Sequence, residues 1–267
     1  LQQAGKLKVR LYAMLAPTKE NKEFYLKNGP VFKDRLTVNS FKVYADGALG
    51  SRGACLTDPY TDEPKEIGFL LSTEKEFREL AQLLAASKFQ MNTHAIGDSA
   101  NRLILNIYGQ ALQGQQDRRW RIEHAQVITP ADMNKFGQFG IVPSVQPTHA
   151  TSDMYWAGER LGAERLKTAY AYEQLRQQYG QVAIGSDFPV EDINPLFGFH
   201  SAVARQDAKN YPAGGFQPAN ALSRPDALRG MTTWAAHAAF EDNQKGSIAS
   251  GMAADFVVVD TDLLEAP

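Results

Sequence analysis

Short apolar runs alternate with segments of helical pattern along this chain, and this alternation constrains the fold more than any other feature. The runs are rich in apolar and β-branched residues and are bounded by Gly, Pro, Asn or Asp, which predicts strands. They lie near residues 8–15, 38–45, 89–94, 119–125, 141–146 and 181–186. Strands that alternate with helices favour a parallel sheet with helices covering it.

Helical patterns fill the intervals between these strands. They are expected near residues 18–28, 73–87, 98–113, 130–138 and 159–178, and again at 196–206 and 224–238 after the last strand. Thr73, followed by acids in the first turn, and Thr129-Pro130 are typical of helix starts. A closed (β/α) barrel has eight strands, whereas six are predicted here and the chain opens directly on a strand. We therefore expect an α/β barrel that lacks its first strands.

Four potential metal ligands stand at the ends of predicted strands: Lys42, His94, His124 and Asp187. The parallel strands of a barrel bring such residues to one common end, where active sites of this architecture lie. Nitrogen and oxygen ligands suit zinc or a similar divalent ion, so the pattern predicts a metal-dependent hydrolase. Each residue also has a simpler interpretation. His94 and His124 would then be hydrogen-bonded structural histidines, and Asp187 a turn or N-cap aspartate.

Lys42 is the unusual member of this set. Phe41 and Val43 predict a half-buried strand around it, where an ammonium group is costly. Two interpretations stay open. Either the side chain extends to the rim of the barrel, or it is carboxylated and its carbamate oxygens bridge two divalent ions.

Composition and charge narrow the possible partners. The 267-residue chain has a formal charge of −2, a pI near 6.3 and no long basic run, so nothing indicates a nucleic acid or an anionic membrane as partner. No apolar stretch approaches the ~20 residues of a membrane span. These features favour a small neutral or weakly charged substrate. The first residues have neither an initiator Met nor a signal-peptide pattern, so we expect the interior of a longer polypeptide, with the cytoplasm as the default compartment.

Further candidates are less specific. His149 and Asp153 are expected on the loop that follows Gln146-Pro147, where they either contact substrate or are surface residues. Residues 46–71 are rich in Gly, Pro and Asp, and at the mouth of a barrel such a loop is a candidate substrate cover. Within it, Arg52 and Asp46 would bind a substrate carboxylate or orient the lysine, although Asp followed by Gly is also typical of a turn.

The remaining polar residues favour no other chemistry. Cys55 is the single cysteine, so it cannot form an internal disulfide, and it is expected to be a packing residue. The chain has no Gly-x-Ser-x-Gly elbow, which disfavours a serine nucleophile. His200 and His237 fall on predicted helices and are expected to be structural.

Several phrases of the sequence together resemble one family. They are Lys42 through Arg52, Thr93-His94-Ala95-Ile96-Gly97-Asp98, Glu123-His124-Ala125, Ser144-Val145-Gln146-Pro147, Gly185-Ser186-Asp187-Phe188-Pro189 and Gly251 to Val258. In this order, and over nearly the whole chain, they resemble the amidohydrolase superfamily and, within it, the subgroup similar to N-substituted formamide deformylases.

The resemblance implies a TIM-like (β/α)8 barrel that binds one or two divalent ions, most simply Zn²⁺. Residues 1–240 would then supply strands three to eight, and residues 241–267, which predict a turn and a strand, would lead into a small β-sandwich. Lys42, His94, His124 and Asp187 would be the metal ligands on strands four, five, six and eight. The family's His-x-His pair on the first strand does not occur here. We therefore expect the first two strands to be absent and this chain alone to be inactive.

The resulting hypothesis is hydrolysis of a C–N bond of amide or formamide type in a small molecule by metal-activated water. Asp187 would carry the proton, and His124 would stabilise the oxyanion. The alternative is a non-catalytic barrel module for binding or assembly. An incomplete barrel exposes sheet edges and apolar interior, so we expect a further segment of the polypeptide, or a second copy in a homo-oligomer, to cover them.

Overall fold

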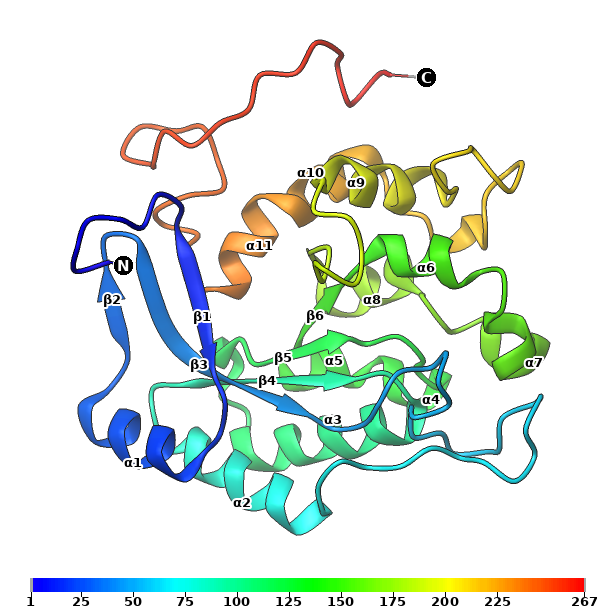
Figure 1. Ribbon diagram of the computed structural model, residues 1–267, viewed down its shortest axis with the longest axis horizontal. Helices are drawn as coiled ribbons and strands as arrows, with labels where there is room; N and C mark the ends of the chain where they lie inside the picture. Colours follow the sequence, from blue (N-terminus) through cyan, green and yellow to red (C-terminus); the bar gives the residue numbers. More distant parts are fainter. Residues whose placement is uncertain (1, 267) are drawn as a thin grey trace.

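The computed structural model describes residues 2–266 and shows a curved sheet whose strands are separated by helices (Figure 1). The strands are β1 (Leu11–Leu15), β2 (Val31–Lys33), β3 (Leu36–Tyr44), β4 (Gln90–Ala95), β5 (Arg121–His124), β6 (Val142–Val145) and β7 (Ala183–Ile184). The helices are α1 (Lys19–Asn28), α2 (Glu74–Ala85), α3 (Asp98–Leu112), α4 (Pro130–Met133), α5 (Lys135–Phe139), α6 (Pro147–Asp153), α7 (Ala157–Leu166), α8 (Tyr172–Tyr179), α9 (Pro195–Ala204), α10 (Arg224–Met231) and α11 (Thr233–Ala238). Short 3-10 turns lie at Gln116–Arg118 and Pro218–Asn220.

The strand order is β1-β3-β4-β5-β6-β7, and every neighbouring pair in this series is parallel. Spatial order therefore follows chain order, as it does in the wall of a barrel, and the carboxyl ends of all six strands lie at one edge. The predicted α/β fold with a TIM-like parallel sheet is confirmed. The short strand β2, which pairs antiparallel with β3, was not predicted. Among the described residues β1 and β7 do not pair with each other, so the sheet is an open half-barrel.

The two faces of the sheet differ in chemistry because successive strand residues point to opposite sides. Phe41, Met91 and Ile122 are fully buried against the helices. The helices follow the curve of the sheet from α2 and α3 below it in Figure 1 to α10 and α11 above it. The alternate residues Arg121 and Glu123 point into the concave interior, where the functional residues also lie.

Helix α2 illustrates how the sequence fixes the helical layer. The Thr73 hydroxyl accepts a hydrogen bond from the Glu76 amide at 3.3 Å, and the Glu76 carboxylate accepts one from the Thr73 amide at 2.8 Å, which makes a capping box. Phe77, Ala81 and Leu84 form its buried face. Because burying a Phe or Leu side chain contributes roughly 1.5–3 kcal/mol, this face attaches α2 to its neighbours. The predicted helix start at Thr73 is confirmed.

Several helix predictions need correction. Residues 159–178 do not form one helix, because α7 ends at Leu166 and α8 begins only at Tyr172. Gly162, with φ of 71°, also interrupts α7. The predicted helices at 130–138 and 224–238 are each divided, at Asn134 and Thr232.

A further correction concerns His149 and Asp153. Both lie on α6 rather than on a loop, and Asp153 is its last residue. Pro147 occupies the first turn of this helix, where its fixed φ is suited to helix initiation and its missing amide proton has no consequence. The helix begins directly after β6, so His149 lies close to the strand edge.

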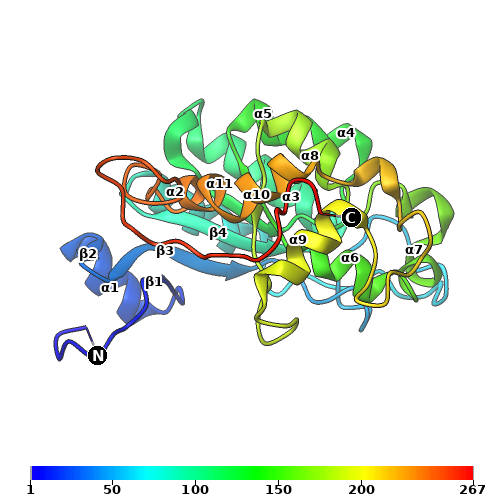
Figure 2. The same cartoon turned by 90° about the horizontal axis from the view of Figure 1, so that it is seen from above.

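The predicted strand in the last segment is also wrong. Among the described residues after α11 there is no strand, and Val257 and Val258 are 85% and 88% exposed. A β-branched run forms a strand only when a neighbouring strand supplies hydrogen bonds, and none lies beside this run. In Figures 1 and 2 the segment runs outside the helices as an extended chain.

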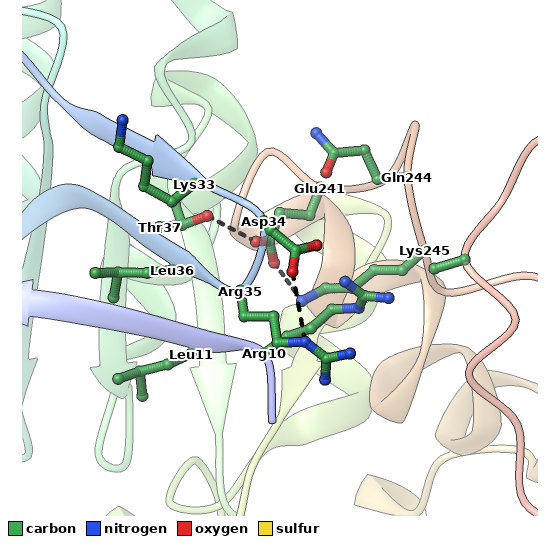
Figure 3. A pocket seen from close by; sticks show the side chains of 11 residues that line it. Arg10, Leu11, Lys33, Asp34, Arg35, Leu36, Thr37, Glu241, Gln244 and Lys245 are labelled. Carbon is green, nitrogen blue, oxygen red and sulfur yellow. Dashed lines mark hydrogen bonds and ion pairs between the residues drawn. The ribbon is translucent and has the colours of Figure 1, made fainter. Parts of the chain in front are cut away.

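A cavity of about 60 Å³ lies where this segment passes the amino ends of β1 and β3 (Figure 3). Its lining is highly charged, and three of its cations pair with carboxylates. These pairs are Arg10 with Asp255 at 2.7 Å, Arg35 with Asp34 at 3.5 Å, and Lys245 with Glu241 at 2.5 Å. The pairing indicates a structural junction between the chain ends.

Residues 46–71 form an anchored loop. The Tyr60 hydroxyl donates to the Ala54 carbonyl at 2.8 Å, and the Thr61 amide donates to the Arg160 carbonyl on α7 at 2.9 Å. At Gly97 a Cβ atom would lie 2.0 Å from the Cys55 carbonyl oxygen, so only glycine permits this close approach. The loop is thus fixed both to α7 and to the turn after β4.

None of the helices within residues 2–266 is long and apolar enough to cross a membrane.

Candidate active site

The carboxyl edge of the sheet brings three of the four predicted ligands together. Lys42 lies near the end of β3, His94 near the end of β4, and His124 is the last residue of β5. The register pairs Tyr44 with His94, so the two strands end level with each other. The predicted convergence of these strand ends is observed for the lysine and both histidines.

His94 and His124 form the centre of the site. Their ring centroids are 4.6 Å apart in an edge-to-face arrangement. His94 Nε2 and His124 Nδ1 are buried and have no hydrogen-bond partner. Burial is the main reason that the pKa of His94 falls to about 4 and that of His124 to about 2. Both imidazoles are therefore neutral near neutral pH, and each has a buried nitrogen that makes no hydrogen bond.

A backbone turn brings His124 into the interior. Glu123 already points inward, so strand alternation alone would direct its neighbour His124 toward the helices. His124 has φ of 76° and Ala125 has φ of 45°, in the left-handed region that non-glycine residues rarely adopt. This conformation costs of order 1–3 kcal/mol and tends to occur at functional sites. It places the His124 ring between His94 and His149, whose ring stacks on it at 5.6 Å.

Lys42 is partly buried beside these histidines. Its ammonium nitrogen lies 4.3 Å from the centroid of the Tyr44 ring. Burial lowers the pKa of Lys42, and the carboxylates of Glu123 and Asp187 partly oppose this shift. The lysine is therefore a partly buried amine within the electrostatic influence of two carboxylates, which is a setting in which amine chemistry changes readily.

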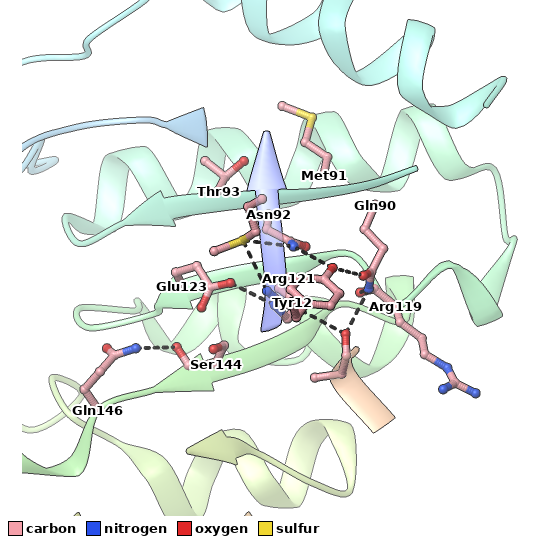
Figure 4. Close-up of polar contacts among 12 residues, drawn as sticks. Tyr12, Gln90, Met91, Asn92, Thr93, Arg119, Arg121, Glu123, Ser144 and Gln146 are labelled. Atoms are coloured by element: carbon pink, nitrogen blue, oxygen red, sulfur yellow. Dashed lines mark hydrogen bonds and ion pairs between the residues drawn. The ribbon is translucent and has the colours of Figure 1, made fainter. Parts of the chain in front are cut away.

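Sequence reasoning missed a buried ion pair directly below the histidines. Arg121 Nε donates to Glu123 Oε1 at 2.8 Å, and both side chains are about nine-tenths buried. Figure 4 shows the two side chains pointing toward one another on the inner face, with Tyr12 beside the guanidinium. Burial disfavours ionisation of Glu123, but the charges of Arg121 and Lys42 outweigh it and lower its pKa. The signal was available, because an Arg-x-Glu spacing within an apolar strand places opposite charges on one face.

The other side of the site is formed by the residues after β6 and β7. Asp187 has φ of 58°, and its side chain is 41% exposed. His149 Nε2 lies 3.9 Å from Asp187 Oδ2 and 3.9 Å from Glu191 Oε1 and makes no hydrogen bond. Burial raises the pKa of Asp187 and lowers that of His149 to about 4. Glu191, which sequence reasoning also missed, is held by the Ser152 hydroxyl at 2.7 Å.

Asp153 is a partly buried acid at the end of α6. The Tyr170 hydroxyl donates to its Oδ2 atom at 2.8 Å, and the Gln126 amide donates to the same atom at 3.3 Å. Burial raises the pKa of Asp153 to about 6. Its carboxylate thus forms part of a buried hydrogen-bond network beside the site.

Arg52 is already paired. Its guanidinium binds both oxygens of Asp62, at 3.2 and 2.8 Å, and Arg160 binds the same carboxylate. The pair is on the anchored loop 46–71, and its geometry is bidentate. Arg52 therefore holds the loop, and a substrate carboxylate would have to compete with Asp62 for it.

The donor groups fit a divalent ion in part. Such an ion requires neutral imidazoles with free nitrogens, and His94 and His124 supply them. Within residues 2–266, however, no three His, Cys, Asp or Glu side chains lie close enough together to bind one ion. The described side chains therefore provide a partial ligand set centred on the two histidines.

Comparison with known proteins gives a consistent picture. The amidohydrolase family matches residues 1–267. Among curated proteins, the protein LONG AFTER FAR-RED 3 of Arabidopsis thaliana is 39% identical over 239 residues, which is 88% of this chain and 41% of that protein. The putative amidohydrolase YtcJ of Bacillus subtilis is 32% identical, over 84% of this chain and 42% of that protein. The N-substituted formamide deformylase of Arthrobacter pascens is 28% identical, over 84% and 41%.

Two solved structures have the same fold over the full chain. An uncharacterized metal-dependent hydrolase from Pyrococcus horikoshii superposes with a TM-score of 0.88 at 28% identity, over 100% of this chain and 53% of that one. A counterpart from Pyrococcus furiosus gives a TM-score of 0.86, also at 28% identity, over 99% and 53%. The chain thus spans 41–42% of the length of these three relatives and 53% of the two solved structures.

Proposed function

Because the chain belongs to the amidohydrolase family, we propose that its strand ends form part of a metal-dependent hydrolase site that cleaves a C–N bond of amide or formamide type in a small molecule. The observation that carries this proposal is the pair of neutral imidazoles His94 and His124, with ring centroids 4.6 Å apart, together with the buried Nδ1 of His124, which makes no hydrogen bond. Leaving that nitrogen unpaired costs about 1–3 kcal/mol, which a bound cation would offset.

The residues of this chain have distinct roles in the proposal. His94 and His124 would hold a divalent ion, most simply Zn²⁺, with Lys42 beside them as an amine or as its carbamate, and Asp187 as a further ligand. When bound, the ion would lower the pKa of a water molecule and polarise the substrate carbonyl. Asp187, whose exposed carboxylate faces Lys42 and His149, would accept and return the proton. His124 would stabilise the oxyanion, and His149 and Asp153 would contact the substrate.

One observation favours the alternative, a non-catalytic barrel module. The described side chains do not by themselves provide three convergent ligands of the His, Cys, Asp or Glu type. A module of that kind would keep its fold and bind no ion, whereas the hydrolase needs one. Metal content therefore discriminates between the two functions.

The test is elemental mass spectrometry on the chain, alone and extended by its upstream sequence, with Asp187→Asn as the paired variant. We expect near-stoichiometric zinc or a similar ion in the extended form and hydrolysis of N-formyl or N-acyl compounds. Asp187→Asn should lower the hydrolysis rate by about 10²–10⁴-fold. A folded extended form that holds no ion after metal is supplied would exclude the hydrolase.

We also propose that the open edges of β1 and β7 are covered in the working protein, either by further polypeptide or by a second copy of this chain. Unpaired edge strands otherwise promote aggregation. Sedimentation of the isolated chain should then show self-association, and the extended form should reduce it.

A further inference from the structure

Asp46, two residues beyond β3, has an unusual environment. It is 1% exposed, and its carboxylate accepts hydrogen bonds from three backbone amides. The amides of Cys55 and Gly97 donate to Oδ2, each at 2.8 Å, and the amide of Ile96 donates to Oδ1 at 3.0 Å. The carboxylate therefore connects the loop 46–71 to the turn between β4 and α3.

The same carboxylate faces His94. Asp46 Oδ1 lies 3.6 Å from His94 Nε2, and this nitrogen is buried without any hydrogen bond. The separation exceeds a hydrogen bond by a few tenths of an ångström, and a small ring rotation would close it. A buried N–H left without an acceptor costs about 1–3 kcal/mol. Besides the Gly47 backbone, which also interacts with the His94 ring, the Asp46 oxygen is the side-chain acceptor that the geometry offers to His94 Nε2.

We propose that Asp46 is a positioning residue that keeps His94 in the tautomer protonated at Nε2. Nδ1 is then the nitrogen with a free lone pair, presented to whatever binds between His94 and His124. A carboxylate behind a ligand histidine fixes the tautomer and the ring orientation and increases ligand basicity. The importance of this role for metal binding rests on the proposed function, whereas the tautomer itself does not.

Loop anchoring alone does not require a carboxylate at this position. The loop is independently held to α7 by the hydrogen bond from the Thr61 amide and by the ion pair of Asp62 with Arg160. Asp46 differs from these anchors because it faces His94, a candidate metal ligand. Asp46 also fixes His94 relative to the loop, and the other anchors do not contact His94.

The direct test is the ¹⁵N spectrum of the histidine rings in the metal-free chain at about pH 8.5, above the pKa of Asp46 at about 7, where His94 is neutral and Asp46 is ionised. His94 resonances are assigned by their loss in His94→Gln. We expect a protonated Nε2 and an unprotonated Nδ1. A His94 ring protonated at Nδ1 in the native chain would overturn the proposal without any variant being needed.

Variants of two loop carboxylates distinguish a role of Asp46 in positioning His94 from a role in folding. Asp46→Asn places an amide donor near Nε2, so the His94 tautomer should change to a mixture or invert. The matched control is Asp62→Asn, which weakens a carboxylate anchor of the same loop and should leave the His94 tautomer unchanged. A folded Asp46→Asn chain with an unaltered tautomer would contradict the proposal. Failure of the whole chain to bind metal would instead count against the proposed function, because the tautomer is measured without metal.

Discussion

The two sides of the candidate site are built in different ways. At the ends of β3, β4 and β5, Lys42 and His94 are partly buried and His124 is buried, and the charged pair Arg121–Glu123 lies on the same inner face. At the end of β7 the strand has two residues, and Asp187 is 41% exposed. The first side is fixed by the interior of the sheet, and the second by loops and helix starts. We therefore expect substitutions on the first side to lower the free energy of unfolding, whereas substitutions on the second side should change it little.

The largest expected effect tests the buried side. Glu123→Gln removes the charge that compensates Arg121 without creating a cavity. Breaking a buried pair by removing one partner typically costs about 3–5 kcal/mol, and we expect a loss of about 3 kcal/mol in the free energy of unfolding, measured by urea denaturation.

The control for this variant is Glu164→Gln. Glu164 also pairs with a cation, Lys167 at 2.8 Å, but its side chain is 84% exposed, so no measurable change is expected. If Glu123→Gln and Glu164→Gln lowered the free energy of unfolding equally, burial of the ion pair would not explain the effect.

The next effect is pH-dependent and concerns His149, which lies between the two sides. Burial lowers its pKa from 6.5 to about 4. The unfolded chain therefore binds more protons than the folded chain between these values, and the neutral ring's contribution to stability is lost as the pH falls through this window. A shift of this size corresponds to about 3 kcal/mol.

The variant His149→Gln separates the contribution of His149 to stability from that of acids whose protonation has the opposite effect. Asp46 and Asp153 have raised pKa values, about 7 and about 6, and they stabilise the folded chain on acidification. They are present in both proteins, so the difference in unfolding free energy between native and variant chains should change by about 3 kcal/mol between pH 6.5 and pH 4. Parallel stability curves would show that His149 is not buried as a neutral ring.

The fold was predictable because it depends on patterns that are local in sequence. Apolar runs located six strands, and the Thr73 capping box located a helix start. The last predicted strand failed because pairing, and not propensity, decides whether Val257 and Val258 form a strand. The continuous helix at 159–178 failed because the chain leaves the helix between Leu166 and Tyr172, where Tyr170 has φ of 53°, and because Gly162 at positive φ interrupts α7.

The site was predictable where residues stand at strand ends and hidden where they depend on tertiary contacts. Lys42, His94 and His124 follow from strand termini that share one edge. Asp46 was indistinguishable from an ordinary turn aspartate, because its three amide donors come from residues 9 to 51 positions away. Arg52 was a candidate for substrate binding because nothing in the sequence showed that Asp62 would bind it.

A smaller effect, on metal affinity, tests whether Asp46 positions His94 on the buried side of the site. If Asp46 positions His94, Asp46→Asn should weaken the binding of Co²⁺ or Zn²⁺ by about 10–100-fold, as loss of an outer-shell partner generally does. Competition with a chromophoric chelator would measure it on the extended chain, with Asp62→Asn as the control. Unchanged affinity in Asp46→Asn would mean that the loop contact alone explains the carboxylate.

The smallest effect is expected on the exposed side. Asp187→Asn keeps the size of the side chain, and asparagine tolerates the left-handed backbone that Asp187 adopts at φ of 58°. Its carboxylate makes no hydrogen bond to the sheet interior and is partly solvated, so the free energy of unfolding should change by less than about 0.5 kcal/mol. Urea denaturation of Asp187→Asn and Glu123→Gln side by side would measure the contrast directly.

A loss of unfolding free energy from Asp187→Asn as large as that from Glu123→Gln would mean that Asp187 contributes to folding. The difference between a fixed side and an adaptable side of the site would then not hold. A negligible loss would leave this carboxylate free to serve chemistry, because the fold does not depend on its charge.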